Sequence, residues 1–290
     1  MFVPVATFRF VHNNLHWGYK VKGSQVLRTI IAARRRRIEE ARASVSLESL
    51  RRTAESRSDI RDFAAAISGE VLSVIAELKK ASPSRGLLRP EFRPIEIAHA
   101  YQQSGASALS VLTEEEFFQG SLNDLTAARG AVSLPVLRKD FIVDEYQVYE
   151  AVAAGADAFL LIVAALEDGD LKHFLSLAKQ LRAMALVEVH TAEELDRAVA
   201  SGARIIGINN RNLHTLEVSL ETSLRLREKI PPPCLAVSES GIKRGEDLER
   251  LAKAGFNAVL IGEHLMLAGD PGEELSRLLK SAPTLKMAGA

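Results

Sequence analysis

The chain has 290 residues, and its 37 basic and 37 acidic side chains cancel to a formal net charge of zero. This balance gives the molecule no overall attraction to nucleic acid or to an anionic membrane. The single cysteine, Cys234, excludes an internal disulfide and a cysteine-based zinc site, and no apolar run approaches the roughly 20 residues that span a bilayer.

Residues 1–23 show no periodicity, and Arg9 interrupts the apolar start before a signal-peptide core of usual length is built. We interpret them as a poorly ordered extension whose removal leaves activity unchanged, and we expect a cytoplasmic protein. The domain is expected to cover residues 24–290, including N-terminal helices within 24–67. The expected helices are Val26–Ala43, Leu47–Ala54 and Ile60–Ile67.

The first of these helices carries a basic run, Arg34 to Arg37. Such a run could bind RNA or an acidic partner. We favour a solvated helix face whose charge is offset by Glu39 and Glu40.

From Val71 onward, short apolar runs rich in β-branched residues alternate with helical patterns. Strands separated by helices pair in parallel, and eight such units predict a closed (β/α)8 barrel with extra N-terminal helices. The expected strands are Leu72–Leu78, Ala108–Thr113, Pro135–Lys139, Ala158–Val163, Ala185–Val189, Ile205–Asn209, Leu235–Glu239 and Ala258–Gly262.

An internal repeat supports the barrel. Gly105, Gly155, Gly202 and Gly255 each follow a predicted helix, at intervals of 50, 47 and 53 residues. Glycine suits the left-handed position after a helix, and the regular interval fits four βαβα quarters. A doubly wound open sheet is the alternative fold, but no GxGxxG follows the first strand.

Charged and polar residues gather at the carboxyl ends of the predicted strands, where barrels of this type place their active sites. On its own, the pair Glu77 and Lys79 could be a surface salt bridge of little energetic value. Several unpaired charges at one rim would cost too much for packing to explain, so we interpret the set as functional. These residues are Glu77, Lys79, Lys139, Glu188, Asn209 and Glu239.

The last two strands are followed by glycine-containing turns, Ser240-Gly241 and Gly262-Glu263. Barrels often bind phosphate in the loops after strands seven and eight, through backbone N–H groups. The segment Lys80 to Pro94 is rich in Ser, Pro, Gly and Arg, so we predict an irregular, mobile lid over the site.

These motifs together resemble the indole-3-glycerol phosphate synthase family of tryptophan biosynthesis. The resemblance runs from about Val26 to Leu279, and His264 stands where the family more usually has a small residue. The matching motifs are Ile75-Ala76-Glu77-Leu78-Lys79 with Ser82-Pro83-Ser84, Val136 to Phe141, Leu186 to His190, Ile206 to Leu213, Ser238 to Ile242, and Leu260 to Glu263.

The resemblance implies ring closure, decarboxylation and dehydration of 1-(2-carboxyphenylamino)-1-deoxyribulose 5-phosphate. Lys139 is the expected acid in ring closure, and Lys79 stabilises the substrate carboxylate. A neighbouring lysine would make Lys139 a better donor by lowering its pKa. Glu188 is the expected base or paired acid, and Glu77 orients the lysines and substrate. Either lysine could donate the proton in dehydration.

The remaining family positions bind the substrate. Asn209 and Glu239 are expected to hold its hydroxyls and amine, while Ser82, Pro83 and Phe141 contact it, the last two along the anthranilate ring. Ser240, Gly241, Gly262 and Glu263 are expected to hold the phosphate. His190 and His214 are interpreted as structural residues.

The resemblance implies no metal and no organic cofactor, because the chemistry is acid–base catalysis on a reactive aminoketone. The implied partner is a small phosphorylated substrate, with no nucleic acid and no membrane. Transient contact with other enzymes of the tryptophan pathway stays open.

Two alternative functions make different demands on the strand ends. An isomerase of the same barrel type, such as phosphoribosylanthranilate isomerase, would be expected to carry a cysteine at the end of strand one and an aspartate at strand six. Here these ends carry Glu77 with Lys79, and Asn209. A non-catalytic scaffold would be expected to have lost rim charges, and none of the expected ones is missing.

Overall fold

A computed structural model describes residues 23–213 and 215–282. The expected N-terminal extension lies outside the described residues, apart from Gly23, where the first helix begins. His214 also lies outside them. Among the described residues, no helix combines the length and the apolar character needed to cross a membrane.

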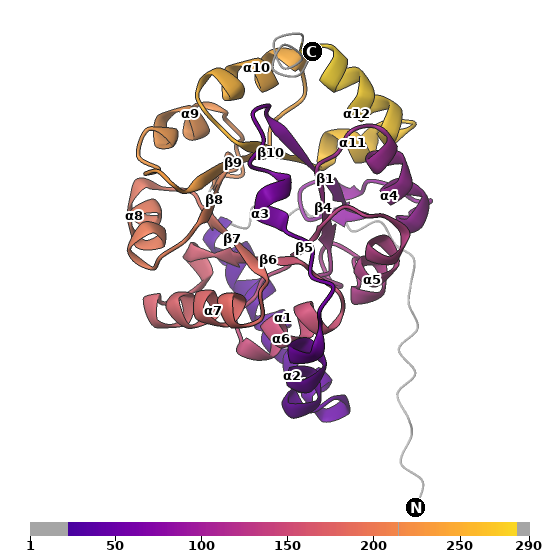
Figure 1. Ribbon diagram of the computed structural model, residues 1–290, viewed down its shortest axis with the longest axis vertical. Coiled ribbons are helices and arrows are strands. Elements are labelled where there is room, and N and C mark those ends of the chain that lie inside the picture. Colours follow the sequence, from indigo (N-terminus) through magenta and orange to yellow (C-terminus); the bar gives the residue numbers. More distant parts are fainter. Residues whose placement is uncertain (1–22, 214, 283–290) are drawn as a thin grey trace, which may run out of the picture.

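The core of the fold is a closed barrel of eight parallel strands, which confirms the predicted (β/α)8 class (Figure 1). Each strand runs between bounds within one residue of the prediction. The barrel strands are β1 Ser73–Leu78, β4 Ala108–Leu112, β5 Val136–Lys139, β6 Ala158–Ile162, β7 Met184–Val189, β8 Ile205–Asn209, β9 Leu235–Glu239 and β10 Ala258–Ile261.

Helices form the outer ring and follow the barrel strands in sequence (Figure 1). The repeated glycines after α4, α6, α8 and α10 have φ angles between 83° and 106°, the left-handed conformation expected of them. The helices of the ring are α4 Pro94–Gln103, α5 Leu122–Ala131, α6 Glu145–Ala153, α7 Asp168–Gln180, α8 Ala192–Ala200, α9 Glu221–Arg227, α10 Gly245–Lys253, α11 Glu263–Leu267 and α12 Pro271–Lys280.

Alternate strand residues face opposite sides of the barrel wall and form two apolar clusters. Inward residues such as Ile75, Leu137 and Leu186 fill the barrel, and outward residues pack against the helices. Helix α3, Phe63–Ala66, is shorter than the predicted Ile60–Ile67 and lies at the centre of the ring of strands in Figure 1. Its Phe63 joins the inner cluster and closes one end of the barrel.

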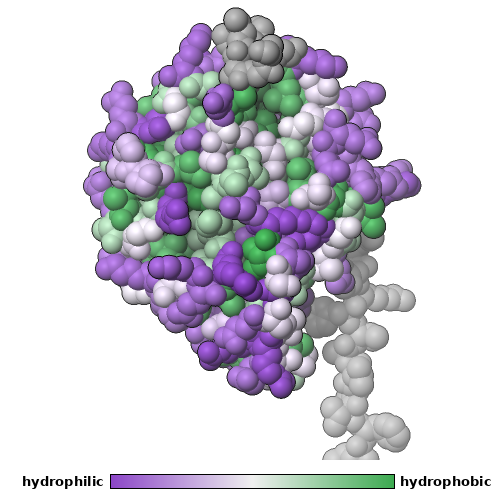
Figure 2. All heavy atoms as spheres, in the orientation of Figure 1, coloured by the Kyte–Doolittle hydropathy of each residue, from purple (hydrophilic) through white to green (hydrophobic). Residues whose placement is uncertain are grey.

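Two helices precede α3 and lie beside the barrel: α1 Gly23–Ser44 and α2 Leu47–Ser56, of which α2 packs on α6. The basic run of α1 is not the uniformly solvated face that we predicted. Arg34 is 4% exposed, whereas the next three arginines are exposed. Figure 2 shows, in the orientation of Figure 1, the face of the barrel on which α3 lies. Hydrophilic residues project there from the surrounding helices.

The predicted irregular segment Lys80 to Pro94 contains regular structure. Two short antiparallel strands, β2 Ala81–Ser82 and β3 Gly86–Leu87, form a hairpin. Arg89 ties the segment to the end of α11 by donating to the carbonyl oxygens of Ala268 at 3.0 Å and Gly269 at 3.1 Å. The turn chemistry of Ser, Pro and Gly therefore builds a hairpin here, and its mobility stays a prediction.

Candidate active site

A cavity of about 1260 Å³ opens at the carboxyl ends of the barrel strands. All of the residues that the sequence analysis proposed for catalysis, substrate binding and phosphate binding line this cavity. They are Glu77, Lys79, Ser82, Pro83, Lys139, Phe141, Glu188, Asn209, Glu239, Ser240, Gly241, Gly262 and Glu263.

The parallel register explains why residues so distant in sequence meet. Asn209 in β8 lies opposite Glu239 in β9, and Glu188 in β7 lies opposite Gly207 in β8. Because side chains alternate along each strand, residues at these levels point into the barrel above the apolar filling.

Two lysines, each close to one or more carboxylates, line the cavity. The Lys139 Nζ atom lies 3.4 Å from Glu188 Oε2 and 3.6 Å from Glu239 Oε2. Lys79 Nζ lies 2.7 Å from Glu77 Oε1, so these two side chains point the same way. The contacts of Lys139 are long for charge-assisted hydrogen bonds, so its N–H groups can turn toward a ligand.

The pKa of Lys139 is raised, contrary to our expectation that a neighbouring lysine would lower it. Burial by itself would lower this pKa, but the negative charges of Glu188, Glu239 and Glu77 outweigh burial. The three carboxylates act more strongly than the second lysine, and Lys139 is therefore firmly protonated at neutral pH.

Glu188 is held in its ionised form by two cations. Burial would raise its pKa, but Lys139 and then His190 lower it well below the usual range. His190 lies between carboxylates, with Nε2 3.4 Å from Glu188 Oε1 and Nδ1 3.1 Å from Glu194 Oε2. Burial would lower the pKa of His190, yet Glu188 and Glu194 raise it to about 9. Glu194, which lies in the first turn of α8 four residues after His190, was not among the predicted site residues.

Glu239 is 1% exposed, and within the described part of the chain neither of its carboxylate oxygens has a hydrogen-bond partner. Burial and the nearby charge of Glu188 raise its pKa to about 8, despite the opposing effect of Lys139. Such an unpartnered polar group is costly unless a ligand satisfies it. Space for it comes from Gly207, where a Cβ atom would lie 2.1 Å from Glu239 Oε1.

One end of the cavity is suited to an anion. Ser240 and Gly241 have φ angles of 70° and 85°, which turn the chain sharply after β9. Glu263 does not present a free carboxylate there, because it lies 3.3 Å from Arg85 and 3.4 Å from Arg211. Arg211 belongs to the family motif Ile206 to Leu213 but was not predicted to be a site residue. His264 pairs with Glu274 at 2.5 Å.

The other end of the cavity is aromatic and apolar. Phe118 packs against Phe141 with ring centroids 6.0 Å apart, and Phe117 lies beside them in the cavity wall. Leu27 and Ile30 of α1 complete this wall. Phe141 was predicted from the sequence and the other residues of this wall were not, although the adjacent phenylalanines after the second barrel strand were a visible signal.

The closed barrel and the charged cavity at the carboxyl ends of its strands define the class: a (β/α)8-barrel enzyme with acid–base groups beside an anion-binding end. Solved structures share the fold at low identity. Thiamine phosphate pyrophosphorylase from Pyrococcus furiosus superposes with a TM-score of 0.57 at 16% identity, covering 76% of this chain and 99% of that one. The 3-hexulose-6-phosphate synthase from Salmonella typhimurium gives 0.58 at 13% identity, covering 73% and 100%.

Sequence comparison is more specific. Residues 27–278 match the family model of indole-3-glycerol phosphate synthase. The protein of that name from Polaromonas naphthalenivorans is 50% identical over 259 residues, covering 88% of this chain and 98% of the relative. That from Chloroherpeton thalassium is 54% identical over 241 residues, covering 82% and 93%. This chain belongs to the indole-3-glycerol phosphate synthase family.

Proposed function

We propose that the chain is an indole-3-glycerol phosphate synthase that converts 1-(2-carboxyphenylamino)-1-deoxyribulose 5-phosphate by acid–base catalysis. The observation that carries this proposal is the protonated Lys139 between Glu188 and Glu239, with Lys79 and Glu77 in the same cavity. This set supplies proton donors and acceptors between an aromatic end and an anion-binding end.

In ring closure, the aromatic carbon that carries the carboxylate attacks the substrate carbonyl carbon. The carbonyl oxygen takes a proton and becomes a hydroxyl group, for which Lys139 is the proposed donor. Its positive charge also stabilises negative charge that develops on that oxygen. Carbon dioxide then leaves, and the bonding electrons restore the aromatic ring. Lys79 is placed to hold the substrate carboxylate before it leaves.

Dehydration removes the new hydroxyl as water and takes a proton from the neighbouring carbon. Glu188 is the proposed base, because the cations beside it keep it ionised. The leaving hydroxyl needs a proton from Lys139 or Lys79, and both lie in the cavity. Glu77 holds Lys79 at 2.7 Å and so fixes its direction.

Binding is divided between the two ends of the cavity. We propose that Pro83 and Phe141 contact the anthranilate ring, with Ser82, the last residue of β2 before the hairpin turn, beside them. Asn209 and Glu239 hold the hydroxyls and amine, which would give Glu239 the hydrogen-bond partners that it lacks. Ser240, Gly241, Gly262 and Glu263 hold the phosphate through backbone N–H groups, with Arg85 and Arg211 nearby.

The chain lacks the residues that an isomerase of this barrel type would need. Such an isomerase would need a cysteine at the end of β1 and an aspartate at the end of β8, where the structure has Glu77 with Lys79, and Asn209. The one cysteine, Cys234, precedes β9 and so lies at the opposite end of that strand from the cavity.

The test is a fluorescence time course with the purified chain and 1-(2-carboxyphenylamino)-1-deoxyribulose 5-phosphate, without added metal or nucleotide. Growth of indole fluorescence together with release of carbon dioxide is the expected result. Substrate binding without product would show that the pocket lacks the chemistry, and neither binding nor product would overturn the proposal.

A further inference from the structure

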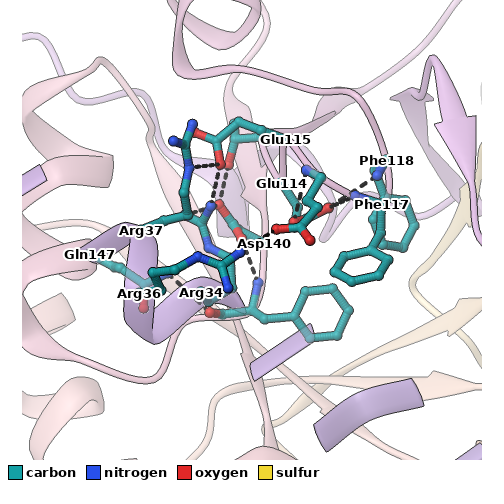
Figure 3. Close-up of polar contacts among 12 residues, drawn as sticks. Arg34, Arg36, Arg37, Glu114, Glu115, Phe117, Phe118, Asp140 and Gln147 are labelled. Carbon is teal, nitrogen blue, oxygen red and sulfur yellow. Dashed lines mark hydrogen bonds and ion pairs between the residues drawn. The ribbon is translucent and has the colours of Figure 1, made fainter. Parts of the chain in front are cut away.

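Helix α1 reaches the mouth of the barrel through side chains. Its early residues Val26, Leu27 and Ile30 line the cavity, and Arg34 follows Ile30 by one helical turn. Arg34 itself does not line the cavity. It points instead toward two carboxylates that belong to other elements, as Figure 3 shows.

Arg34 connects three segments that border the site: α1, the loop after β4 and the end of β5. Its Nη1 atom donates to Glu115 Oε2 at 2.7 Å, and its Nη2 atom donates to Asp140 Oδ2 at 3.1 Å. Glu115 belongs to the loop after β4, which also carries Phe117 and Phe118. Asp140 stands between Lys139 and Phe141 at the end of β5.

Burial separates this contact from the other ion pairs of α1. The side chain of Arg34 is 5% exposed and that of Asp140 is 0% exposed. The pair of Arg36 with Glu116 has exposures of 59% and 47%, and that of Arg42 with Asp144 has 37% and 32%. Exposed pairs contribute little, whereas a buried pair that loses one partner is costly.

The loop after β4 is itself well ordered by Glu114. Its carboxylate accepts from the backbone N–H groups of Phe117 at 2.7 Å and Phe118 at 3.0 Å (Figure 3). The loop can therefore move as a unit, and it is linked to α1 through Glu115 and through the exposed pair of Arg36 with Glu116. Arg34 is the buried part of that link, since Arg37 approaches Glu115 only at 3.6 Å and is half exposed.

Asp140 does not depend on Arg34 for its own position. It also accepts from Arg138 Nη2 at 3.0 Å, from Thr113 Oγ1 at 2.5 Å and from the Phe141 N–H at 2.8 Å. Loss of Arg34 would leave these three donors, so the end of β5 and Lys139 should stay in place.

We propose that Arg34 is a positioning residue for the aromatic half of the substrate site, which seats α1 and the loop after β4 against the end of β5. This inference rests on the proposed function, because it assigns the apolar end of the cavity to the anthranilate ring. Arg34 sets the separation of Leu27 and Ile30 from Phe117, Phe118 and Phe141, and it leaves the phosphate end untouched.

The test compares Arg34→Met with Arg36→Met, which removes the same charge from an exposed position on the same helix. For Arg34→Met we expect KM for the substrate to rise about tenfold, with kcat within about threefold of wild type. Anthranilate alone should bind correspondingly more weakly, and inorganic phosphate should bind equally well. Arg36→Met should behave as wild type throughout.

Several results would overturn the inference. One is a KM for Arg34→Met within twofold of wild type, and another is an equal weakening of anthranilate and phosphate, which would indicate general loosening. If Arg34→Met does not fold, Arg34→Lys decides: it keeps the charge but loses the two-pronged geometry, so its KM must rise, and a wild-type KM refutes the role.

A failure of the proposed function can be distinguished from a failure of the inference about Arg34. The proposed function fails if the wild-type chain does not convert the substrate, and the comparison of anthranilate with phosphate binding would then still test Arg34.

Discussion

At the centre of the cavity, Lys139 faces three carboxylates whose combined charge raises its pKa. A lysine in this setting is a weak acid, but it is always charged. Its value to the reaction therefore lies as much in stabilising negative charge on the substrate oxygen as in releasing a proton. Glu239 differs from its neighbour Glu188, because burial and that neighbour keep it protonated near neutral pH.

Replacing Lys139 tests its role as the acid. We expect Lys139→Ala to lower kcat by at least about a hundredfold, because general acid catalysis and charge stabilisation are lost together. The fold should persist, because His190 still balances the charge of Glu188 and because Glu239 can stay protonated. Steady-state kinetics and a thermal melt check this, with exposed Lys253→Ala as control. Near-normal turnover of Lys139→Ala would remove Lys139 as the acid.

Gly207 makes room for the carboxylate of Glu239. We expect Gly207→Ala to displace that side chain, because a Cβ atom would lie 2.1 Å from its Oε1 atom. The substrate KM should rise roughly tenfold if Glu239 holds the substrate. Gly130→Ala is the matched control, because its Cβ would enter open space on a helix. Equal kinetics for the two variants would show that Glu239 is not placed by Gly207.

His190 should make stability depend on pH. Its pKa of about 9 in the folded chain exceeds the usual 6.5, so the folded state binds the proton more tightly. The stabilisation, up to about 3 kcal/mol, is complete below pH 6.5 and is lost as pH rises through 9. The raised pKa of Glu239 has the same sign: about 8 exceeds the usual 4.5, so its contribution to stability falls as pH rises from 4.5 and is fully lost above about 8.

Melting temperatures between pH 6.5 and 9 provide the measurement. They should fall more steeply for wild type than for His190→Asn, which cannot bind this proton. His173→Asn alters a half-exposed histidine and should keep the wild-type slope. If His190→Asn also keeps that slope, the ion pairs of His190 do not stabilise the fold.

Among the elements, each barrel strand carries different kinds of inward-facing residues at its two ends. The lower inward residues are apolar and meet α3, and the upper ones are charged and meet the cavity. The two short elements α3 and the β2–β3 hairpin therefore have different tasks. Helix α3 fills one end of the barrel, and the hairpin borders the cavity at the other through Ser82 and Pro83.

Phe63 carries the packing of α3 and is fully buried. We expect Phe63→Ala to lower the free energy of unfolding by about 3–5 kcal/mol, because it leaves a cavity between α3 and the barrel filling. Denaturant unfolding measures the change. Ile95→Ala, at a residue 49% exposed on α4, should change stability by no more than about 0.5 kcal/mol. A loss below 1 kcal/mol at Phe63 would show that α3 is not a structural plug.

Across the whole molecule, stability and chemistry lie at opposite ends of the barrel. The end away from the cavity is held by Asp157, which is fully buried and immediately precedes β6. It accepts from Arg129 Nε at 2.9 Å, from the Arg61 N–H at 2.9 Å and from the Val136 N–H at 2.9 Å. This network ties the segment before α3 to two strands and to α5.

Removing the charge of Asp157 should loosen that end without touching the reaction. We expect Asp157→Asn to cost about 3–5 kcal/mol, because Arg129 loses its buried partner and an amide group would face N–H donors. The kcat measured well below the melting temperature should be unchanged. Asp168→Asn removes an exposed pair with Arg197 and should cost less than about 1 kcal/mol. A loss of kcat in Asp157→Asn would contradict this separation.

The local pattern of the chain was enough to predict the barrel and the composition of its active end. Strand length, apolar runs and the glycine interval are local properties, because hydrogen bonding and side-chain alternation act between near neighbours. The eight strands were therefore predicted within one residue. The residues of the active end could be predicted as well, because a parallel barrel brings the carboxyl ends of all its strands to one rim.

Properties set by distant residues were decided only by the tertiary structure. The sequence placed Arg34 in a solvated basic run, but the fold buries it against Asp140, 106 residues away. It suggested that Lys79 lowers the pKa of Lys139, but three carboxylates from other strands raise it. Burial and charge act through space, so both depend on which strands meet, and the local pattern of the chain contains neither.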